Sequence, residues 1–248
     1  MAPLPKYLTA LPVFNEAQHL ESVLNRVRQF SPEILVVNDG SSDGTAELLA
    51  GQEGLHVVTH PVNQGYGAAL RSAFQFALSR DYDVLVTIDC DGQHEPERIP
   101  DLVAAMFLPS GELIDIVSGS RYLKQFDADS LPPEERRRIN LTVTELVNER
   151  LGLTLTDAFC GFKAYRVPTL RQLEITELGY AMPLQVWVQA VAQGWKIVEF
   201  PVPLIYLDAS RSFGGSLDDA NFRLAHYRAV FEHEMLRWFR CGEAALAR

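Results

Sequence analysis

The chain has 248 residues, of which 47% are hydrophobic and 22% charged, a composition typical of a globular protein and unlike a disordered chain or a coiled coil. Its 22 basic and 32 acidic residues give a formal net charge of −10, which disfavours nonspecific binding to nucleic acid or to anionic lipid by charge alone. Its apolar runs are far shorter than the roughly 20 residues of a membrane span, and residues 1–16 lack the apolar core of a signal peptide. We therefore expect a cytoplasmic protein.

The first half of the chain alternates short apolar runs with helical patterns. Strands are expected at residues 7–13, 34–37, 55–59, 84–88 and 114–118. Helices are expected at residues 17–29, from residue 45, and at 65–80 and 96–107. Because strands that alternate with helices imply right-handed crossovers, the pattern predicts an α/β fold with a mostly parallel sheet and helices on both faces.

The second half of the chain loses this regular alternation. Residues 122–137 are rich in Asp, Pro, Glu and Arg and predict a polar surface loop. Helices are expected at 139–151, 181–192 and 218–239, and a strand at 195–202. We expect one domain over 1–248, with a first half at 1–121, a second at 122–217 and a C-terminal helix at 218–248. The apolar stripe of that helix could pack on the sheet, on a second copy in a homodimer, or on a membrane surface.

The three cysteines, Cys90, Cys160 and Cys241, are widely spaced and form no CxxC motif. They indicate reduced, buried thiols rather than a disulfide scaffold or a zinc site.

Polar residues follow five of the expected strands, where the carboxyl ends of a parallel sheet place ligands. These segments are residues 12–16, 38–44, 63–67, 89–94 and 118–121. Asp89 and Asp91 are the most specific feature, because two carboxylates so close together repel unless a cation lies between them. Hard carboxylate oxygens suit Mg²⁺ or Mn²⁺, and Gln93 could add a neutral oxygen. A solvated turn after the strand is the alternative.

Several other motifs are excluded by their spacing. The acidic run from Asp39 to Asp43 starts like a calcium loop, but Ala50 stands at the twelfth position, where a carboxylate is required. The Gly65-Tyr-Gly67 turn lacks the third glycine of a dinucleotide fingerprint, and no GxxxxGK[ST] or HExxH motif is present in the sequence.

The ordered series of motifs resembles that of glycosyltransferase family 2. The series is Pro12-x-Phe-Asn-Glu16, Val37-Asn-Asp-Gly-Ser-Ser-Asp-Gly-Thr45, Asn63-x-Gly-x-Gly67, Asp89-x-Asp-x-Gln-His94, Ser118-Gly-Ser-Arg121 and Asp157-x-x-Cys-Gly-Phe-Lys163. More narrowly, roughly residues 8–215 resemble the dolichol-phosphate mannosyltransferase (polyprenyl-phosphate glycosyltransferase) branch. The resemblance implies a GT-A fold, a nucleotide-diphosphate sugar donor such as GDP-mannose or UDP-glucose, Mg²⁺ or Mn²⁺, inversion at the anomeric carbon and a polyprenyl-phosphate acceptor reached at the membrane surface.

The resemblance also implies roles for particular residues at the donor. The nucleotide-sugar pocket is expected to include Pro12, Asn15, Glu16, Asp39, Gly65, Gly67 and Asp89. Within it, Glu16 is expected at the ribose, Asp39 is expected to accept a hydrogen bond from the base, and the two glycines are expected to let the backbone approach the nucleotide. The metal ligands are expected to be Asp89, Asp91 and Gln93, and Arg211 is expected near the phosphates.

On the acceptor side, Arg121 is expected to clamp a phosphate, although a surface ion pair is the ordinary role of such a residue. Asp157 lies where the family has a candidate active-site carboxylate. It is the candidate base if the acceptor is a hydroxyl, and a helix N-cap is the alternative. The arginines at 136–138 could meet an acceptor phosphate or pair with nearby glutamates.

The chain departs from the family pattern at three positions. Asn38 replaces the first of two aspartates, which bears on base selectivity. Gln185 stands where glutamate is frequent and Leu217 where lysine is common, and both bear on the acceptor. Two alternative functions stay open at this point: a transferase acting on a soluble hydroxyl acceptor, and a noncatalytic protein that binds nucleotide sugars on the same fold.

Overall fold

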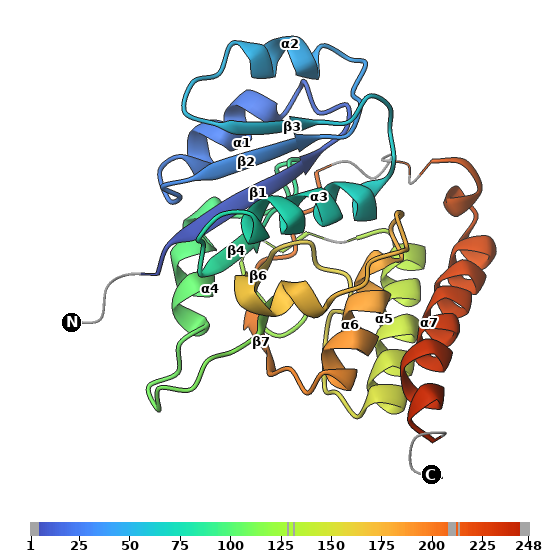
Figure 1. The fold of residues 1–248 in the computed structure, drawn as a ribbon. Coiled ribbons are helices and arrows are strands. Elements are labelled where there is room, and N and C mark those ends of the chain that lie inside the picture. Colours follow the sequence, from blue (N-terminus) through green and yellow to red (C-terminus); the bar gives the residue numbers. More distant parts are fainter. Residues whose placement is uncertain (1–4, 128, 131, 208–211, 213, 244–248) are drawn as a thin grey trace.

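A computed structural model describes residues 5–127, 129–130, 132–207, 212 and 214–243, with side chains described as far as residue 239. Its centre is a seven-stranded sheet in the order β3-β2-β1-β4-β6-β5-β7 (Figure 1). The strands are β1 (Tyr7–Val13), β2 (Ile34–Asn38), β3 (His56–Thr59), β4 (Val84–Thr87), β5 (Ile116–Ser120), β6 (Lys163–Arg166) and β7 (Ile197–Pro201).

The sheet is parallel except at β6. Strands β1, β2, β3 and β4 pair in parallel, as do β5 and β7, whereas β6 lies antiparallel between β4 and β5. The predicted mostly parallel α/β sheet is therefore confirmed. Strand β6 was not predicted, because its four residues begin with Lys163 and end with Arg166 and so lack an apolar run. Its direction brings residues 157–162 to the edge where the parallel strands end.

Helices cover both faces of the sheet. They are α1 (Leu20–Val27), α2 (Thr45–Ala50), α3 (Tyr66–Leu78), α4 (Ile99–Ala105), α5 (Glu134–Leu151), α6 (Met182–Ala192) and α7 (Ala220–Glu243). Short 3₁₀ segments lie at η1 (Pro96–Arg98), η2 (Val167–Gln172) and η3 (Gly215–Asp218). Figure 1 shows α5, α6 and α7 side by side on one face. No helix within the described ranges combines the length and the hydropathy needed to cross a bilayer.

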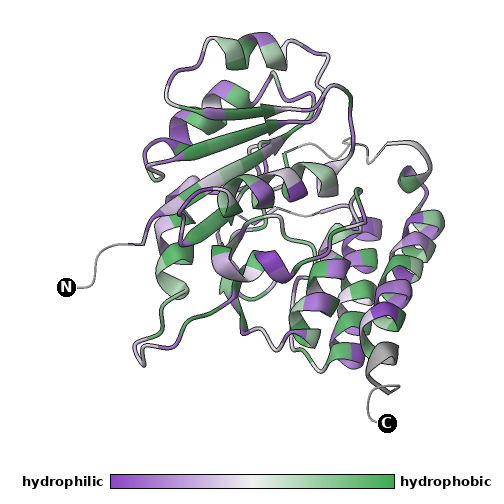
Figure 2. Ribbon diagram, viewed as in Figure 1, coloured by the Kyte–Doolittle hydropathy of each residue, from purple (hydrophilic) through white to green (hydrophobic). Residues whose placement is uncertain are grey.

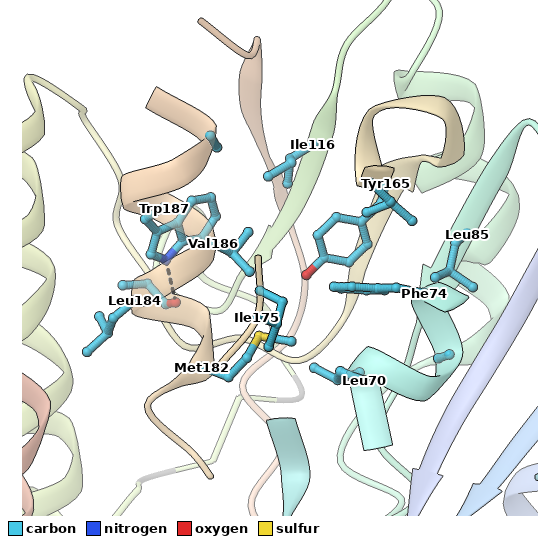
Figure 3. Close-up of a cluster of buried hydrophobic side chains, with 14 of the residues drawn as sticks. Leu70, Phe74, Leu85, Ile116, Tyr165, Ile175, Met182, Leu184, Val186 and Trp187 are labelled. Carbon is cyan, nitrogen blue, oxygen red and sulfur yellow. Dashed lines mark hydrogen bonds between the residues drawn. The ribbon is translucent and has the colours of Figure 1, made fainter. Parts of the chain in front are cut away.

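Each face of the sheet has its own hydrophobic core. One core lies under α1 and α4 and includes Leu24 and Leu102. The other joins α3, α5, α6 and α7 and surrounds Trp187. Figure 3 shows this second core, in which the indole N–H of Trp187 donates a hydrogen bond, 2.9 Å long, to the Ala158 carbonyl. In Figure 2 the central strands are largely hydrophobic, whereas the helices carry both hydrophobic and hydrophilic residues.

Two predicted boundaries were wrong in the second half of the chain. Helix α5 begins at Glu134, inside the segment 122–137 that was expected to be a loop, so the three arginines lie in its first turns. The polar composition hid this start, because the buried face of α5 begins only at Ile139. Helix α7 begins at Ala220 after the short η3, two residues later than expected.

Candidate functional site

A pocket of about 700 Å³ opens at the carboxyl edge of the sheet. A volume of this size suits a nucleotide-sized ligand. Eight of the predicted site residues line it: Pro12, Glu16, Asp39, Gly65, Asp89, Asp91, Gln93 and Arg121. They come from five separate loops, which the parallel strands bring together at one edge.

Three of the predicted residues lie outside the pocket wall, and a fourth, Arg211, lies outside the described residues. Asn15 has a φ of 56° and supports the turn after β2: its backbone N–H donates to Ser41 Oγ at 2.9 Å, and its Oδ1 accepts from the Ser42 N–H at 2.8 Å. Asn15 therefore holds the backbone of the turn after β2 and does not itself line the pocket.

The close backbone approach at Gly65 and Gly67 is to another part of the protein. A Cβ atom on Gly65 would lie 2.3 Å from the Leu178 carbonyl oxygen, and one on Gly67 would lie 2.5 Å from that of Glu177. Gly65 also has a φ of 106°, a conformation that L residues rarely adopt. The lack of a side chain at Gly67 lets the start of α3 pack on residues 177–179, and the expected approach of this glycine to a nucleotide stays a prediction.

Asp39 is a nearly buried carboxylate at the base of the pocket. It accepts hydrogen bonds from the backbone N–H groups of Gln64 and Gly65, at 3.0 and 2.7 Å. Its neighbour Asn38 is outside the wall, and its Oδ1 accepts from the Ser41 N–H at 3.0 Å. An amide at position 38 thus closes the turn after β2.

The Asp89–Gln93 segment forms a tightly packed group of oxygen donors. Tyr66 donates its hydroxyl hydrogen to Asp89 Oδ1 at 3.2 Å, and a Cβ atom on Gly161 would lie 2.3 Å from Asp89 Oδ2. Asp91 accepts from the backbone and side-chain nitrogens of Gln93, at 3.0 and 2.9 Å. Asp91 therefore lies in a turn after β4, and Gln93 bonds to it through nitrogen atoms, which leaves the Gln93 amide oxygen for a ligand.

This donor set fits a hard divalent cation. Two carboxylates and an amide oxygen match Mg²⁺ or Mn²⁺, which keep open positions for water and phosphate oxygens. Across the described residues, no group of three or more His, Cys, Asp and Glu side chains is arranged to hold a metal ion. Asp89, Asp91 and Gln93 are the residues that would hold such a cation.

Arg121 and Asp157 form a charged pair at the wall of the pocket. Arg121 Nε donates to Asp157 Oδ2 at 2.7 Å and Nη2 donates to Oδ1 at 3.0 Å, and Asn140 adds a bond to Oδ1 at 2.9 Å. Burial alone would raise the pKa of Asp157, but the charge and hydrogen bonds of Arg121 and the bond from Asn140 lower it to about 2. A fully buried carboxylate behind Arg121 is poorly placed to accept a proton from a substrate, so the geometry favours a positioning role.

Lys163 ends the last motif of the series, and the structure shows that it is a buried charge, which the sequence analysis did not expect. Its Nζ donates to Ser118 Oγ at 2.9 Å and to the Cys160 carbonyl, and lies 5.0 Å from the centre of the Trp187 ring. Burial lowers the pKa of its ammonium group. The sequence contains one hint of this burial, because Lys163 stands alone between the apolar residues Phe162 and Ala164. The pattern of alternating strands and helices did not assign this segment to any element.

The pocket lining also includes aromatic, apolar and basic side chains. These are Tyr122, Arg136, Arg137, Ile139, Phe159, Tyr180, Leu204, Tyr206, Leu217 and Tyr227. The loop before α5 is fixed there, because Asp129 Oδ1 accepts from the Leu204 N–H at 2.8 Å. The buried Arg223 donates to the Leu217 carbonyl at 2.6 Å and to Glu135 at 2.8 Å, which ties η3 and α7 to α5.

Helix α7 packs on the body of the protein. Tyr227 and Phe231 are buried in the core around Trp187. Of the three packing arrangements that the sequence left open, docking on the core is the one observed for this face. The aromatic side chains Phe222 and Phe239 on the same helix stay exposed.

The cysteines whose side chains the structure describes are buried, as predicted. These are Cys90 and Cys160; the thiol of Cys160 is free, and burial raises its pKa to about 11. The side chain of Cys241 lies outside the described residues.

A mostly parallel sheet with acidic, amide and glycine loops at its carboxyl edge, where a pocket opens, is the arrangement of glycosyltransferases of the GT-A fold. The chain belongs to glycosyl transferase family 2, whose sequence profile matches residues 9–173. The predicted family and fold are thus confirmed.

Curated relatives and solved structures agree with this assignment. The chain is 32% identical to the undecaprenyl-phosphate mannosyltransferase of Micrococcus luteus, covering 94% of this chain and 98% of the relative. It is 31% identical to the polyprenol monophosphomannose synthase of Mycolicibacterium smegmatis, covering 91% and 88%. Its fold is similar to glucosyl-3-phosphoglycerate synthase from Mycobacterium tuberculosis, solved with Mn²⁺, uridine diphosphate and phosphoglyceric acid, with a TM-score of 0.67, 21% identity and coverage of 94% and 78%.

Proposed function

We propose that this chain transfers a hexose from a nucleotide-diphosphate sugar to a polyprenyl-phosphate acceptor. The observation that carries the proposal is that one pocket is lined both by oxygen-bearing side chains and by arginines and apolar side chains. The oxygen-bearing side chains suit a metal-bound diphosphate, and the arginines and apolar side chains suit a phosphate attached to a hydrocarbon chain. The names of the relatives from Micrococcus luteus and Mycolicibacterium smegmatis support the same acceptor class.

At the donor end, Asp39 and Glu16 would contact the nucleoside, because both line the pocket close to the oxygen-rich group. Asp89, Asp91 and Gln93 would hold the divalent cation. When bound, that cation stabilises negative charge on the leaving diphosphate. The resemblance to mannosyltransferases makes GDP-mannose the first candidate donor and UDP-glucose the second.

At the acceptor end, Arg121 and Arg137 would bind the phosphate through charge-assisted hydrogen bonds. A phosphate monoester has a second pKa near ~6, so its oxygen is mostly ionised at neutral pH and needs no general base. It would attack the anomeric carbon from the face opposite the leaving group. Asp157 would serve by fixing the guanidinium of Arg121, and the apolar residues Ile139 and Leu217 would contact the first isoprene units.

The donor arm of the test is a thermal-shift panel with GDP, UDP, CDP and dTDP sugars in the presence of Mg²⁺ or Mn²⁺. A donor at 100 times its dissociation constant stabilises the folded state by ~2.7 kcal/mol, which raises Tm by roughly 5 °C or more in a domain of this size. The absence of a shift with every sugar would contradict the nucleotide-sugar assignment.

The acceptor arm uses the stabilising donor with a short-chain polyprenyl phosphate in detergent, and with the matching polyprenol as control. We expect a glycosylated phospholipid from the first and none from the second, because the control lacks the phosphate that the arginines would bind. Saturable transfer to a soluble hydroxyl acceptor, with no response to polyprenyl phosphate, would place the protein in the alternative class.

A further inference from the structure

A chain of three side chains runs outward from the floor of the pocket. His60 Nδ1 lies 2.6 Å from Asp39 Oδ1, and His60 Nε2 lies 2.8 Å from Ser72 Oγ. His60 follows β3 and Ser72 belongs to α3, so the chain crosses from the sheet to a helix on its surface. His60 and Asp39 are 9% and 3% exposed, which shields the contact between them from water.

The direction of these hydrogen bonds follows from the chemistry of the groups. An ionised carboxylate only accepts, so His60 Nδ1 carries the proton and donates to Asp39. In the neutral imidazole, Nε2 is then the acceptor, and Ser72 donates its hydroxyl hydrogen to it. The carboxylate of Asp39 thus sets the tautomer of His60, and Ser72 holds the other side of the ring through Nε2.

The bonds to Asp39 leave one particular place for a ligand. Oδ1 accepts from both His60 and the Gln64 N–H, whereas Oδ2 accepts one bond, from the Gly65 N–H. A carboxylate oxygen has two lone pairs, so Oδ2 retains one. Asp39 lines the pocket and His60 does not, so the histidine bonds to the carboxylate from outside the pocket lining, and Oδ2 is the oxygen with a lone pair left for a ligand.

We propose that His60, oriented by Ser72, is a positioning residue for recognition of the donor's nucleobase. It fixes the rotamer of Asp39 so that Oδ2 meets a ring N–H of the base without reorganisation on binding. This inference rests on the proposed function. It assigns a binding role to a histidine for which the sequence motifs gave none.

The inference is tested by isothermal titration of the full chain in Mg²⁺ with GDP, UDP and pyrophosphate. His60→Ala should weaken binding of the preferred nucleotide about tenfold or more, since a buried hydrogen bond to a charged group is lost. Pyrophosphate, which has no base, should bind within about twofold of wild type. His60→Asn should restore most of the affinity, because its amide N–H can donate to Asp39 in place of Nδ1.

The matched control is His56→Ala at the other end of β3. His56 forms a partly exposed pair with Glu33 at 3.1 Å, away from the pocket, so nucleotide affinity should stay at the wild-type value. If His60→Ala fails to fold, Ser72→Ala removes only one hydroxyl and should weaken nucleotide binding while pyrophosphate binding is kept.

NMR spectroscopy tests the hydrogen bonds of Asp39, His60 and Ser72 in the absence of a ligand. The ¹⁵N shifts of the His60 ring should show the Nδ1–H tautomer in wild type and a change in Ser72→Ala. An Nε2–H tautomer in wild type would overturn the inference, as would equal loss of nucleotide and pyrophosphate affinity in His60→Ala. If His60→Ala binds the nucleotides with unchanged affinity, only this inference is contradicted. If the wild-type protein binds neither GDP nor UDP, the proposed function is contradicted as well.

Discussion

Arg121 and Asp157 meet as a two-point ion pair, with Nε 2.7 Å from Oδ2 and Nη2 3.0 Å from Oδ1. They are 36 residues apart and meet because β6 is antiparallel to β5 and starts at the edge where β5 ends, so the segment before β6, which carries Asp157, lies beside Arg121, the residue after β5. Asp157 is fully buried and Arg121 is 23% exposed, so only the arginine faces the pocket. The pair presents a pre-oriented cation whose partner is hidden from substrate.

The first prediction concerns the pH dependence of stability. The pKa of Asp157 is about 2 in the folded protein and ~3.9 in an unfolded chain. The ionised pair therefore contributes ~2 kcal/mol to the free energy of unfolding above about pH 4, and this contribution is lost as the pH falls toward 2. Urea unfolding at pH 7 and pH 3 should show that Asp157→Asn is less stable than wild type at pH 7 by about this amount or more. The difference should narrow at pH 3.

Asp81→Asn is the control for this titration, because Asp81 is exposed. The free energy of unfolding of Asp81→Asn should depend on pH in the same way as that of wild type. A difference between wild type and Asp157→Asn that stays constant from pH 7 to pH 3 would show that the carboxylate is not held in its charged form by Arg121.

The second prediction separates the two ends of the pocket with neighbouring arginines. Arg137 lines the pocket and Arg138 does not, although both are exposed in the first turns of α5. Arg137→Ala should reduce transfer to polyprenyl phosphate about tenfold, since one charge-assisted contact to phosphate is lost. Arg138→Ala should stay near wild type. Both rates are measured with the same donor, together with donor hydrolysis in the absence of lipid.

Combining Arg121→Ala with Arg137→Ala should deepen the loss of lipid transfer while donor hydrolysis is much less affected. If both reactions fall by the same factor, these arginines bind the donor diphosphate, and the acceptor phosphate must be sought elsewhere in the pocket.

The third prediction concerns the oxygen-donor group at residues 89–93. Asp91→Ala should lower turnover at least about 10²-fold and weaken Mn²⁺ binding measured by electron paramagnetic resonance in the presence of nucleotide. Its Tm should change little, because Asp91 is only half-buried and its side chain bonds locally to Gln93. Asp101→Ala, an exposed aspartate on α4, is the matched control. Full activity in excess chelator would contradict metal dependence.

Periodicity and motif order predicted the sheet, most helices and eight wall residues, because these depend on local pattern and on the rule that parallel strands end at one edge. That rule does not predict which way each side chain points. Asn15 and Gly67 belong to the motifs, yet their contacts are with Ser42 and with Glu177, segments distant in sequence. Such contacts form only in the folded chain and produce no periodic pattern in the sequence.

The missed parts share a second physical cause. Lys163 and Glu234 are charged, so an apolar pattern assigns them to the surface, but each is buried with polar partners that arrive from other elements. Burial of a charge is decided by those partners, and only the tertiary structure shows them.

The last prediction follows from one such buried charge. Glu234 on α7 is fully buried and accepts hydrogen bonds from Gln185 Nε2 at 2.7 Å, Gln189 Nε2 at 2.6 Å and Trp238 Nε1 at 2.7 Å. A glutamine at position 185, where the family often has glutamate, is thus explained by packing: its amide donates to a carboxylate that a second carboxylate would repel. This departure from the family pattern lies at the α6–α7 contact and outside the pocket wall.

Gln185→Glu should therefore destabilise the protein by ~3 kcal/mol, because it places two carboxylates together in a buried site. The double variant Gln185→Glu/Glu234→Gln moves the single charge to α6 and should recover ~2 kcal/mol of that loss, a coupling that a double-mutant cycle in urea measures directly. Gln193→Glu, on the exposed end of α6, should stay within ~0.5 kcal/mol of wild type. Since α7 also supplies Tyr227 to the pocket, transfer activity should fall in Gln185→Glu and return in the double variant. Strictly additive effects would show that the two side chains do not interact.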